Sequence, residues 1–486
     1  MKKFLALILF FLTFILKAAA QESIDYAALN QTVKEHLINL ININTAQPEP
    51  EEIYAARYIY KVLNKNKINW DIYRTEKPRA NLIAVLKADK SAAEKNPQEA
   101  LIVTAHLDTS DVQGSFWTIP PTKAMLKDGR IYGLGSTDAK NYAAVNLTIL
   151  TWLKQNNIKL NRDIIFLFTA DEENGSDKGI KFLYDKYPKK IKAGFAINEG
   201  GGIIRNGGKE IMFVEAASKM YMDILLTAYG EGSHSATPGQ SNAIYKLSQA
   251  LSKIEAYKLP LHITPFTVNF LKQIYPLQDE DAKTTISIFL NSKDDDQRRQ
   301  AARIISEDPF FKTQLTDTIS PTIINSGAEA NVVAPEAYAT LNCRLLPDSV
   351  PHNFFAGLAS LFENDDGIKL TILEQPQFPF PQPDPYNNNA LFRAIENAVW
   401  QTISEDTLTV AGLSPASSES EFLRRHNVIT YGIGPRMEKD GGGPHQADEN
   451  ISEESLFEQL KLTLAIILNF ARIKEEDIAE AQKNQE

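Results

Sequence analysis

The chain has 486 residues, of which 43% are hydrophobic and 23% charged, and its formal net charge is −10. This length supplies more than one domain with a core of its own, and the composition is that of ordinary globular proteins. The acidic balance argues against nucleic acid as the main partner. Cys343 is the only cysteine, so an intramolecular disulfide and a zinc–cysteine cluster are both excluded.

The N-terminus has the pattern of a secretion signal. Lys2 and Lys3 precede an apolar run over residues 4–15, and alanines at 18–20 supply a small-residue cleavage pattern. We expect residues 1–20 to be a signal peptide, so the mature protein would be exported, periplasmic or secreted, without a stable membrane anchor. An uncleaved anchor is the alternative, and the short run and the alanines argue against it.

Strand and helix patterns alternate in the first half of the chain. Short apolar runs predict buried strands, and helical periodicity falls between them, with strands at 82–86, 101–105, 164–168 and 194–197 and helices near 54–63 and 143–154. The alternation predicts an α/β domain with a mainly parallel sheet flanked by helices. It covers residues 21–216 and resumes over 377–486, where a strand at 428–431 and a helix at 452–471 are expected.

A smaller α+β unit is expected between these two pieces, over residues 217–376. Its strands and helices are predicted at 222–227, 243–254, 337–345, 354–362 and 368–373. A mostly polar interruption spans 259–320, and its run of three aspartates from Asp294 is interpreted as a solvated helix start. The proline-rich stretch at 376–384 predicts a linker.

Histidine and acidic residues follow three of the buried strands. His106 and Asp108 come after the strand ending at 105, Glu172 and Glu173 after the strand ending near 170, and Glu199 after the strand ending at 197. Taken singly, the motifs would be interpreted as a histidine in a loop at a strand end and as solvated acidic turns. Together they lie at the carboxyl ends of strands, where open α/β sheets build their sites.

Two further candidates lie in glycine-rich segments. Asp138 follows Gly133 and Gly135 just before a helix, where the alternative role is a helix cap, and His445 follows three glycines. Histidine and carboxylate donors without cysteine suit zinc, and cobalt or manganese could substitute for it.

In this order, the motifs resemble the di-zinc metallopeptidase family of aminoacylase, carboxypeptidase G, carboxypeptidase S and acetylornithine deacetylase. The carboxypeptidase S-like subgroup is the most similar. The inserted unit carries a segment from Gly232 to Pro238 that is similar to the lid motif of the family, and Asn331 and Arg344 lie in two further matching motifs. The resemblance implies a catalytic domain interrupted by a lid or dimerisation domain, with 259–320 as a helical lid extension.

The resemblance also implies roles for single residues. Asp138 would bridge two Zn²⁺ ions, and the peptide bond after it is often cis in the family. His106 and Glu199 would complete one ion, and Glu173 and His445 the other. Asp108 would orient the ring of His106. Glu172 would be the general base, since ligand side chains are unable to accept a proton while bound. His234 and Asn331 would stabilise the oxyanion and hold the substrate, and Arg344 would bind its carboxylate.

The implied activity is hydrolysis of an amide bond, most simply by a carboxypeptidase or dipeptidase acting on short peptides. An N-acyl-amino-acid hydrolase is the alternative, and a catalytically silent binding protein of the same fold is a third. The segment Ser418-Glu419-Ser420-Glu421 departs from the Thr-Asp-x-Arg stretch of the subgroup, and Met220 replaces a common glycine. The family includes homodimers, in which the lid histidine acts on the partner's site, and monomers, in which an extension replaces it.

Overall fold

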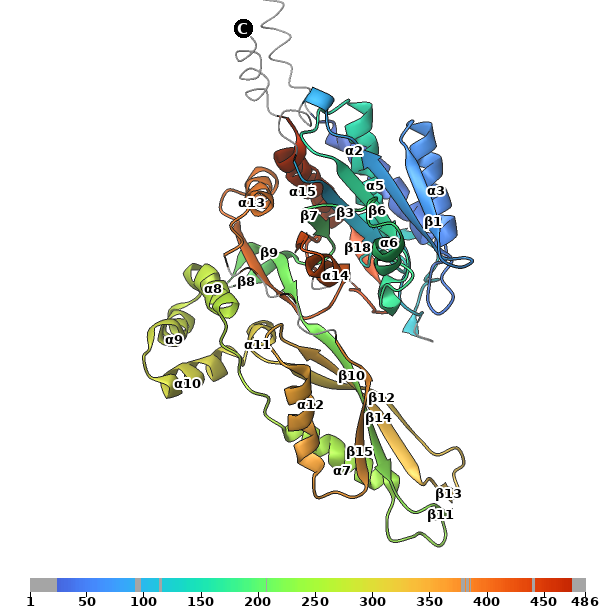
Figure 1. The fold of residues 1–486 in the computed structure, drawn as a ribbon, viewed down its shortest axis with the longest axis vertical. Coiled ribbons are helices and arrows are strands. Elements are labelled where there is room, and N and C mark those ends of the chain that lie inside the picture. Colours follow the sequence, from blue (N-terminus) through green and yellow to red (C-terminus); the bar gives the residue numbers. More distant parts are fainter. Residues whose placement is uncertain are drawn as a thin grey trace, which may run out of the picture.

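A computed structural model describes residues 24–91, 98–112, 116–206, 208–376, 381, 384, 386–438 and 442–473. The expected signal peptide and most of the expected linker lie outside the described residues. The chain forms a large lobe on a nine-stranded sheet and a small lobe on a four-stranded sheet (Figure 1). Among the described residues, no helix has the length and apolarity needed to cross a membrane.

The large sheet has the order β1-β2-β6-β3-β7-β17-β9-β16, with β8 paired to β9. Its centre is parallel as expected, because β6, β3, β7 and β17 run in one direction. Strands β1, β2 and β8 pair antiparallel, so the sheet as a whole is mixed. The strands are β1 (Trp70–Arg74), β2 (Ala80–Leu86), β3 (Leu101–His106), β6 (Ile164–Thr169), β7 (Phe195–Asn198), β8 (Gly202–Asn206), β9 (Lys209–Ser218), β16 (Leu408–Ser414) and β17 (Ile429–Gly432).

Helices cover the large sheet on both faces. One core joins α2, α3, α5, α13 and α15 to one face, and a second core lies between the other face, α6 and α14. Helix α5 is buried along nearly its whole length, as is typical of a helix in the centre of a layer. The helices are α2 (Tyr26–Ile41), α3 (Glu52–Lys65), α5 (Lys140–Gln155), α6 (Ile180–Lys186), α13 (Ala390–Thr402), α14 (Glu419–Arg425) and α15 (Glu453–Ala471).

A short three-stranded sheet stands beside the large one. It has the order β18-β5-β4 and joins the segment after His445 to the segment before Asp138. Its strands are β4 (Met125–Lys127), β5 (Arg130–Tyr132) and β18 (Asn450–Ser452).

The small lobe has the strand order β12-β14-β10-β15. Alternate residues of β10 and β14 are buried, and they pack with α7 and the 351–362 segment, as expected for an antiparallel sheet with one covered face. A two-stranded ribbon, β11 and β13, lies at the tip far from the large lobe (Figure 1). The elements are β10 (Met220–Tyr229), β11 (Ser233–His234), α7 (Ala243–Ala256), β12 (Thr318–Ser326), β13 (Val332–Val333), β14 (Glu336–Leu345), α12 (Pro351–Ala359) and β15 (Ile368–Glu374).

The expected helical extension forms, and it packs against the large sheet and not against the small lobe in which it is inserted. Helices α8 (Pro265–Ile274), α9 (Glu280–Asn291), α10 (Asp295–Ile305) and α11 (Pro309–Leu315) share a core with β9 and β16 of the large sheet. Helix α10 begins after Asp294, which caps it as predicted. The expectation that the extension runs to residue 320 is wrong, because β12 of the small sheet begins at Thr318.

Two glutamines fix the extension to β16, the last strand in the order of the large sheet. Gln314 accepts a hydrogen bond from the N–H of Leu413 at 2.9 Å and donates one to its carbonyl at 2.7 Å. Gln273 accepts from the N–H of Ala411 at 3.2 Å. Amide side chains thus satisfy backbone groups that a neighbouring strand would otherwise pair with.

Candidate metal centre

The first histidine of the site stands at the carboxyl end of β3. His106 is buried, and its Nε2 lies 3.0 Å from Oδ1 of Asp138 and 3.2 Å from Oε2 of Glu199. Asp138 lies two residues before the start of α5, and the Asp138–Ala139 peptide bond is cis, as the resemblance implied. The cap residue of α5 is Ala139 rather than Asp138, so the carboxylate of Asp138 is turned toward histidine and not toward the helix.

The second histidine faces the opposite oxygen of the same carboxylate. Nε2 of His445 lies 3.5 Å from Oδ2 of Asp138 and 3.0 Å from Oε2 of Glu173. Asp138 therefore stands between His106 and His445 with one oxygen directed at each. All five predicted ligands come together at one edge of the large sheet. Their positions after strands predicted this for His106, Glu173 and Glu199.

The electrostatics of this cluster call for a cation. Burial would lower the pKa of His106, but the carboxylates around it, Glu199 first, raise it well above its usual range. Hydrogen bonds with its two carboxylate neighbours raise the pKa of His445 to about 10. Burial and repulsion from Glu199 raise the pKa of Glu172 well above its usual range. Among the described residues, the buried Oε1 of Glu173 has no hydrogen-bond partner. This donor set fits divalent metal ions.

Ligand-type atoms converge in two overlapping groups. One atom each from His106, Asp138 and Glu173 lie within 4.8 Å of one another, and the same holds for His106, Glu172 and Glu199. Glu172, the predicted base, thus borders the same space as the predicted ligands.

Asp108 connects the first histidine to the Glu172–Glu173 turn. Its carboxylate accepts hydrogen bonds from the backbone N–H of Glu172 at 3.1 Å and of Glu173 at 3.2 Å. Its carbonyl accepts from Nδ1 of His106 at 2.9 Å, whereas its nearest carboxylate oxygen is 3.6 Å from that nitrogen. Asp108 therefore contacts the ring of His106 through its backbone oxygen, whereas the carboxylate was the predicted partner.

A buried ion-pair network supports the same turn. The guanidinium of Arg79 lies 2.7 Å from Oε1 of Glu52 and 2.9 Å from Oδ1 of Asp171. Asp171 has a φ of 68° and begins the turn that carries Glu172. Its remaining oxygen accepts from the N–H of Lys178 at 2.9 Å. Asp171, which directly precedes Glu172 in the chain, is therefore structural, and the alternative of a solvated acidic turn does not hold for it.

Glu449 is a functional candidate that the sequence analysis missed. One of its oxygens accepts from the N–H of Gly135 at 2.8 Å. The other accepts from the N–H and hydroxyl of Thr137, at 2.7 and 2.6 Å, and from the N–H of Asp138 at 3.1 Å. The buried carboxylate thus shapes the loop of Asp138 from the segment that carries His445. Its position four residues after His445 was the only available signal.

The two acids of the segment that departs from the family, Glu419 and Glu421, both have partners within the protein. Glu419 is buried beneath the site, where Oε2 accepts from the hydroxyls of Thr104 at 3.2 Å and Thr169 at 3.0 Å. Glu421 is paired with Arg425 at 3.0 Å. Glu419 is only 2% exposed, so its side chain does not face a substrate.

The predicted substrate-binding residues divide into two groups. Arg344 reaches the large lobe, because its Nη1 donates to Oγ of Ser417 at 2.8 Å. His234 and Asn331 lie together at the tip of the small lobe, where the N–H of Ser235 donates to the carbonyl of Asn331 at 2.9 Å. Figure 1 shows this tip at the opposite end of the molecule from β3, so one chain does not bring His234 or Asn331 to the metal centre.

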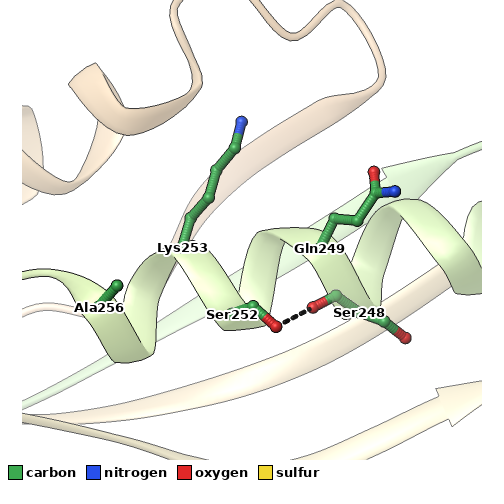
Figure 2. A pocket seen from close by; sticks show the side chains of 5 residues that line it. All are labelled: Ser248, Gln249, Ser252, Lys253 and Ala256. Carbon is green, nitrogen blue, oxygen red and sulfur yellow. Dashed lines mark hydrogen bonds between the residues drawn. The ribbon is translucent and has the colours of Figure 1, made fainter.

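A second depression lies on the small lobe, along the outer face of α7. Figure 2 shows its lining by Ser248, Gln249, Ser252, Lys253 and Ala256. It offers no carboxylate or imidazole, so it lacks the donors for metal-assisted hydrolysis, and the chemistry belongs to the centre at β3.

Comparison with known proteins agrees with this centre. The mouse N-fatty-acyl-amino acid synthase/hydrolase PM20D1 is 26% identical over 388 residues, which are 77% of this chain and 75% of that protein. A probable succinyl-diaminopimelate desuccinylase of Staphylococcus aureus is 28% identical over 430 residues, 87% of this chain and 94% of that protein.

Solved structures share the fold. The M20 metallo-carboxypeptidase Sso-CP2 of Sulfolobus solfataricus aligns with a TM-score of 0.66 at 19% identity, covering 90% of this chain and 98% of that one. Human carnosine dipeptidase 1 aligns with a TM-score of 0.65 at 15% identity, covering 92% and 98%. The family model for peptidase family M20/M25/M40 matches residues 102–469. The chain therefore belongs to this peptidase family and is an enzyme that hydrolyses amide bonds.

Proposed function

We propose that the protein binds two zinc ions and uses them to cleave an amide bond in short substrates that carry a free carboxylate. Asp138 carries the proposal, because its two oxygens face His106 and His445 separately. A carboxylate between two histidines, each with a further acid, is suited to bridge two cations. Imidazole and carboxylate donors favour zinc, with Co²⁺ or Mn²⁺ as substitutes.

The residues divide naturally between two ions. His106 and Glu199 would hold one, His445 and Glu173 the other, and Asp138 both. Bound zinc supplies Lewis acidity that polarises the scissile carbonyl and activates water. The chain contributes the proton transfers: Glu172 would take the proton of the attacking water and deliver it to the leaving nitrogen.

Two adjacent substitutions test this assignment. Glu172→Gln should keep zinc near the wild-type content and lower kcat at least a hundredfold, because the base is lost while the ligands remain. Glu173→Gln should lower the zinc content, because it removes a ligand. Zinc measured by atomic emission, with turnover from the same preparations, separates the two. Full activity in Glu172→Gln would show that Glu172 is not the base.

The substrate class is proposed as short peptides cleaved by an exopeptidase. N-acyl amino acids are the second candidate, because both sequence relatives above are named for acyl or succinyl groups. Both classes present a carboxylate to Arg344. A dipeptide panel assayed beside N-acetyl and long-chain N-acyl amino acids would rank them. No turnover of either class by zinc-loaded protein would favour a silent binding protein instead.

We propose further that the protein acts as a homodimer, in which the tip of one small lobe serves the metal centre of the other chain. The support is the distance of His234 and Asn331 from the centre in their own chain (Figure 1), together with the exposed side chains along β12, which lies at the edge of the small sheet. Mixing His234→Ala with Glu172→Gln under conditions of subunit exchange should restore part of the activity, because each mixed dimer holds one complete site. Inactive mixtures of a protein that sediments as a monomer would exclude the dimer.

Export of the mature protein is proposed from the N-terminal pattern of the sequence. N-terminal sequencing of the protein recovered from the periplasm or medium tests it, with Gln21 as the expected first residue. Recovery of the intact chain in a membrane fraction would favour an anchor.

A further inference from the structure

A network of half-buried polar side chains lies on the small sheet, on the face opposite the core with α7, and ends at Arg344. Arg344 and Asn342 lie two apart on β14 and so point to the same face. The neighbouring strand β10 places Tyr221 opposite Arg344 and Asp223 opposite Asn342. Four polar side chains therefore form a square across two strands.

The hydrogen bonds in this square have a fixed direction. The hydroxyl of Tyr221 donates to Oδ2 of Asp223 at 2.6 Å, and Nδ2 of Asn342 donates to Oδ1 of Asp223 at 2.9 Å. An ionised carboxylate only accepts, so Asp223 determines which end of the Asn342 amide faces it. The carbonyl oxygen of Asn342 is thereby turned to Nε of Arg344, which donates to it at 3.1 Å.

Arg344 is held on two further sides, by the large lobe and by the ring of Tyr221. Its Nη1 donates to Ser417 of the large lobe at 2.8 Å, and its guanidinium lies 4.7 Å from the ring centre of Tyr221. Burial lowers its pKa, while negative groups in range, Glu172 and Glu421 among them, oppose that shift. A guanidinium has five N–H donors, so donors remain beyond Nε and this Nη1 bond to bind an anion.

We propose that Asp223 and Asn342 are positioning residues for substrate selection: they lock the guanidinium of Arg344 in the orientation that receives a free substrate carboxylate. The inference rests on the proposed function, in which Arg344 binds that carboxylate. A guanidinium held by Asn342 loses less side-chain freedom on binding, so the benefit falls on substrates with a carboxylate and not on their neutral amides.

The test is the ratio of kcat/KM for alanyl-leucine to that for alanyl-leucinamide, measured beside N-acetyl-leucine and N-acetyl-leucinamide, in zinc-loaded full-length protein. Asn342→Leu should lower the acid-to-amide ratio about tenfold, through KM of the acids, because a hydrogen bond to a charged group is lost. Asp223→Asn should lower it in the same direction, although no hydrogen bond joins Asp223 to Arg344 among the contacts above. Arg344→Ala is the positive control. Thr340→Val, the next residue on the same face of β14, is the matched control and should leave the ratio unchanged.

A double-mutant cycle decides whether Asp223 acts through Asn342. If it does, Asp223→Asn adds no further loss of selectivity in the Asn342→Leu background. Additive losses, or an unchanged ratio in Asn342→Leu while Arg344→Ala lowers it, would overturn the inference. An equal preference for acids and amides in the wild type would overturn it too. Absence of turnover of all four substrates would instead reject the proposed function.

Discussion

Replacing Glu419 with glutamine should stabilise the protein, and increasingly so as the pH rises. Glu419 is enclosed beneath β3 and β6, and one of its oxygens has no hydrogen-bond partner among the described residues. Burial raises its pKa from 4.5 to about 8. Glutamine has nearly the same shape, and its carbonyl can still accept from Thr104 and Thr169, but it never carries a charge.

The magnitude follows from linkage between protonation and folding. Because the pKa of Glu419 is raised on folding, the contribution of its protonated form to the unfolding free energy is fully present below pH 4.5. That contribution is lost as the pH rises toward 8. At 1.36 kcal/mol per unit of pKa, the full loss is about 5 kcal/mol. The advantage of Glu419→Gln should therefore be about 2 kcal/mol at pH 6 and about 5 kcal/mol at pH 9.

Urea unfolding in the presence of a chelator at both pH values measures this difference. The acidic cluster of the metal centre is the same in both proteins, so its own titration cancels. Glu255→Gln, on the exposed side of α7, serves as the control and should change the unfolding free energy by less than about 0.5 kcal/mol at either pH. If the two free-energy differences for Glu419→Gln agree within about 1 kcal/mol, the raised pKa assigned to Glu419 is wrong.

Three further outcomes are expected. Removing zinc with EDTA should lower Tm by roughly 8 °C, reversibly on adding zinc. Each of the two ions at a thousandfold excess over its Kd stabilises the native state by about 4 kcal/mol, and a chain of this length loses about 1 °C per kcal/mol. An unchanged Tm in calorimetry would contradict a metal centre. Glu449→Ala should weaken zinc binding by at least about tenfold in a chelator competition at 20 °C, because the loop of Asp138 loses its hydrogen-bond acceptor. An affinity equal to that of the wild type would show that the loop keeps its conformation without Glu449. Gln314→Leu should cost about 3 kcal/mol in urea unfolding, because two buried backbone groups of Leu413 lose their partners, whereas Gln249→Leu on the surface of α7 should cost less than about 0.5 kcal/mol.

Three of the proposed ligands could be recognised from local order along the chain, and the resemblance to the family supplied Asp138 and His445. Each of His106, Glu173 and Glu199 directly follows a short apolar strand, and parallel strands bring their carboxyl ends to one edge. The start of α10 could be predicted for a similar reason, since the capping residue Asp294 marks it, whereas the helical character of the whole extension came from the resemblance to the family.

What could not be predicted depends on contacts between distant segments. Glu419 and Glu449 look like ordinary surface acids in the sequence, and only packing against β3 or the loop of Asp138 buries them. The amphipathic helices of the extension have one apolar side, but the pattern does not say which sheet will cover it. The same holds for Arg79, whose partners Glu52 and Asp171 lie on separate elements.

The cover over β16 has a consequence for the order in which the chain is made. Helices α8 and α11 precede β16 in the sequence, so a ribosome delivers Gln273 and Gln314 well before the strand whose backbone they bind. When β16 emerges and pairs with β9, the backbone groups of Ala411 and Leu413 can bind Gln273 and Gln314 at once. These are groups that could otherwise pair with a strand of another chain. The helical extension is therefore synthesised before the edge strand that it covers, so β16 can be protected from pairing with another chain as soon as it forms.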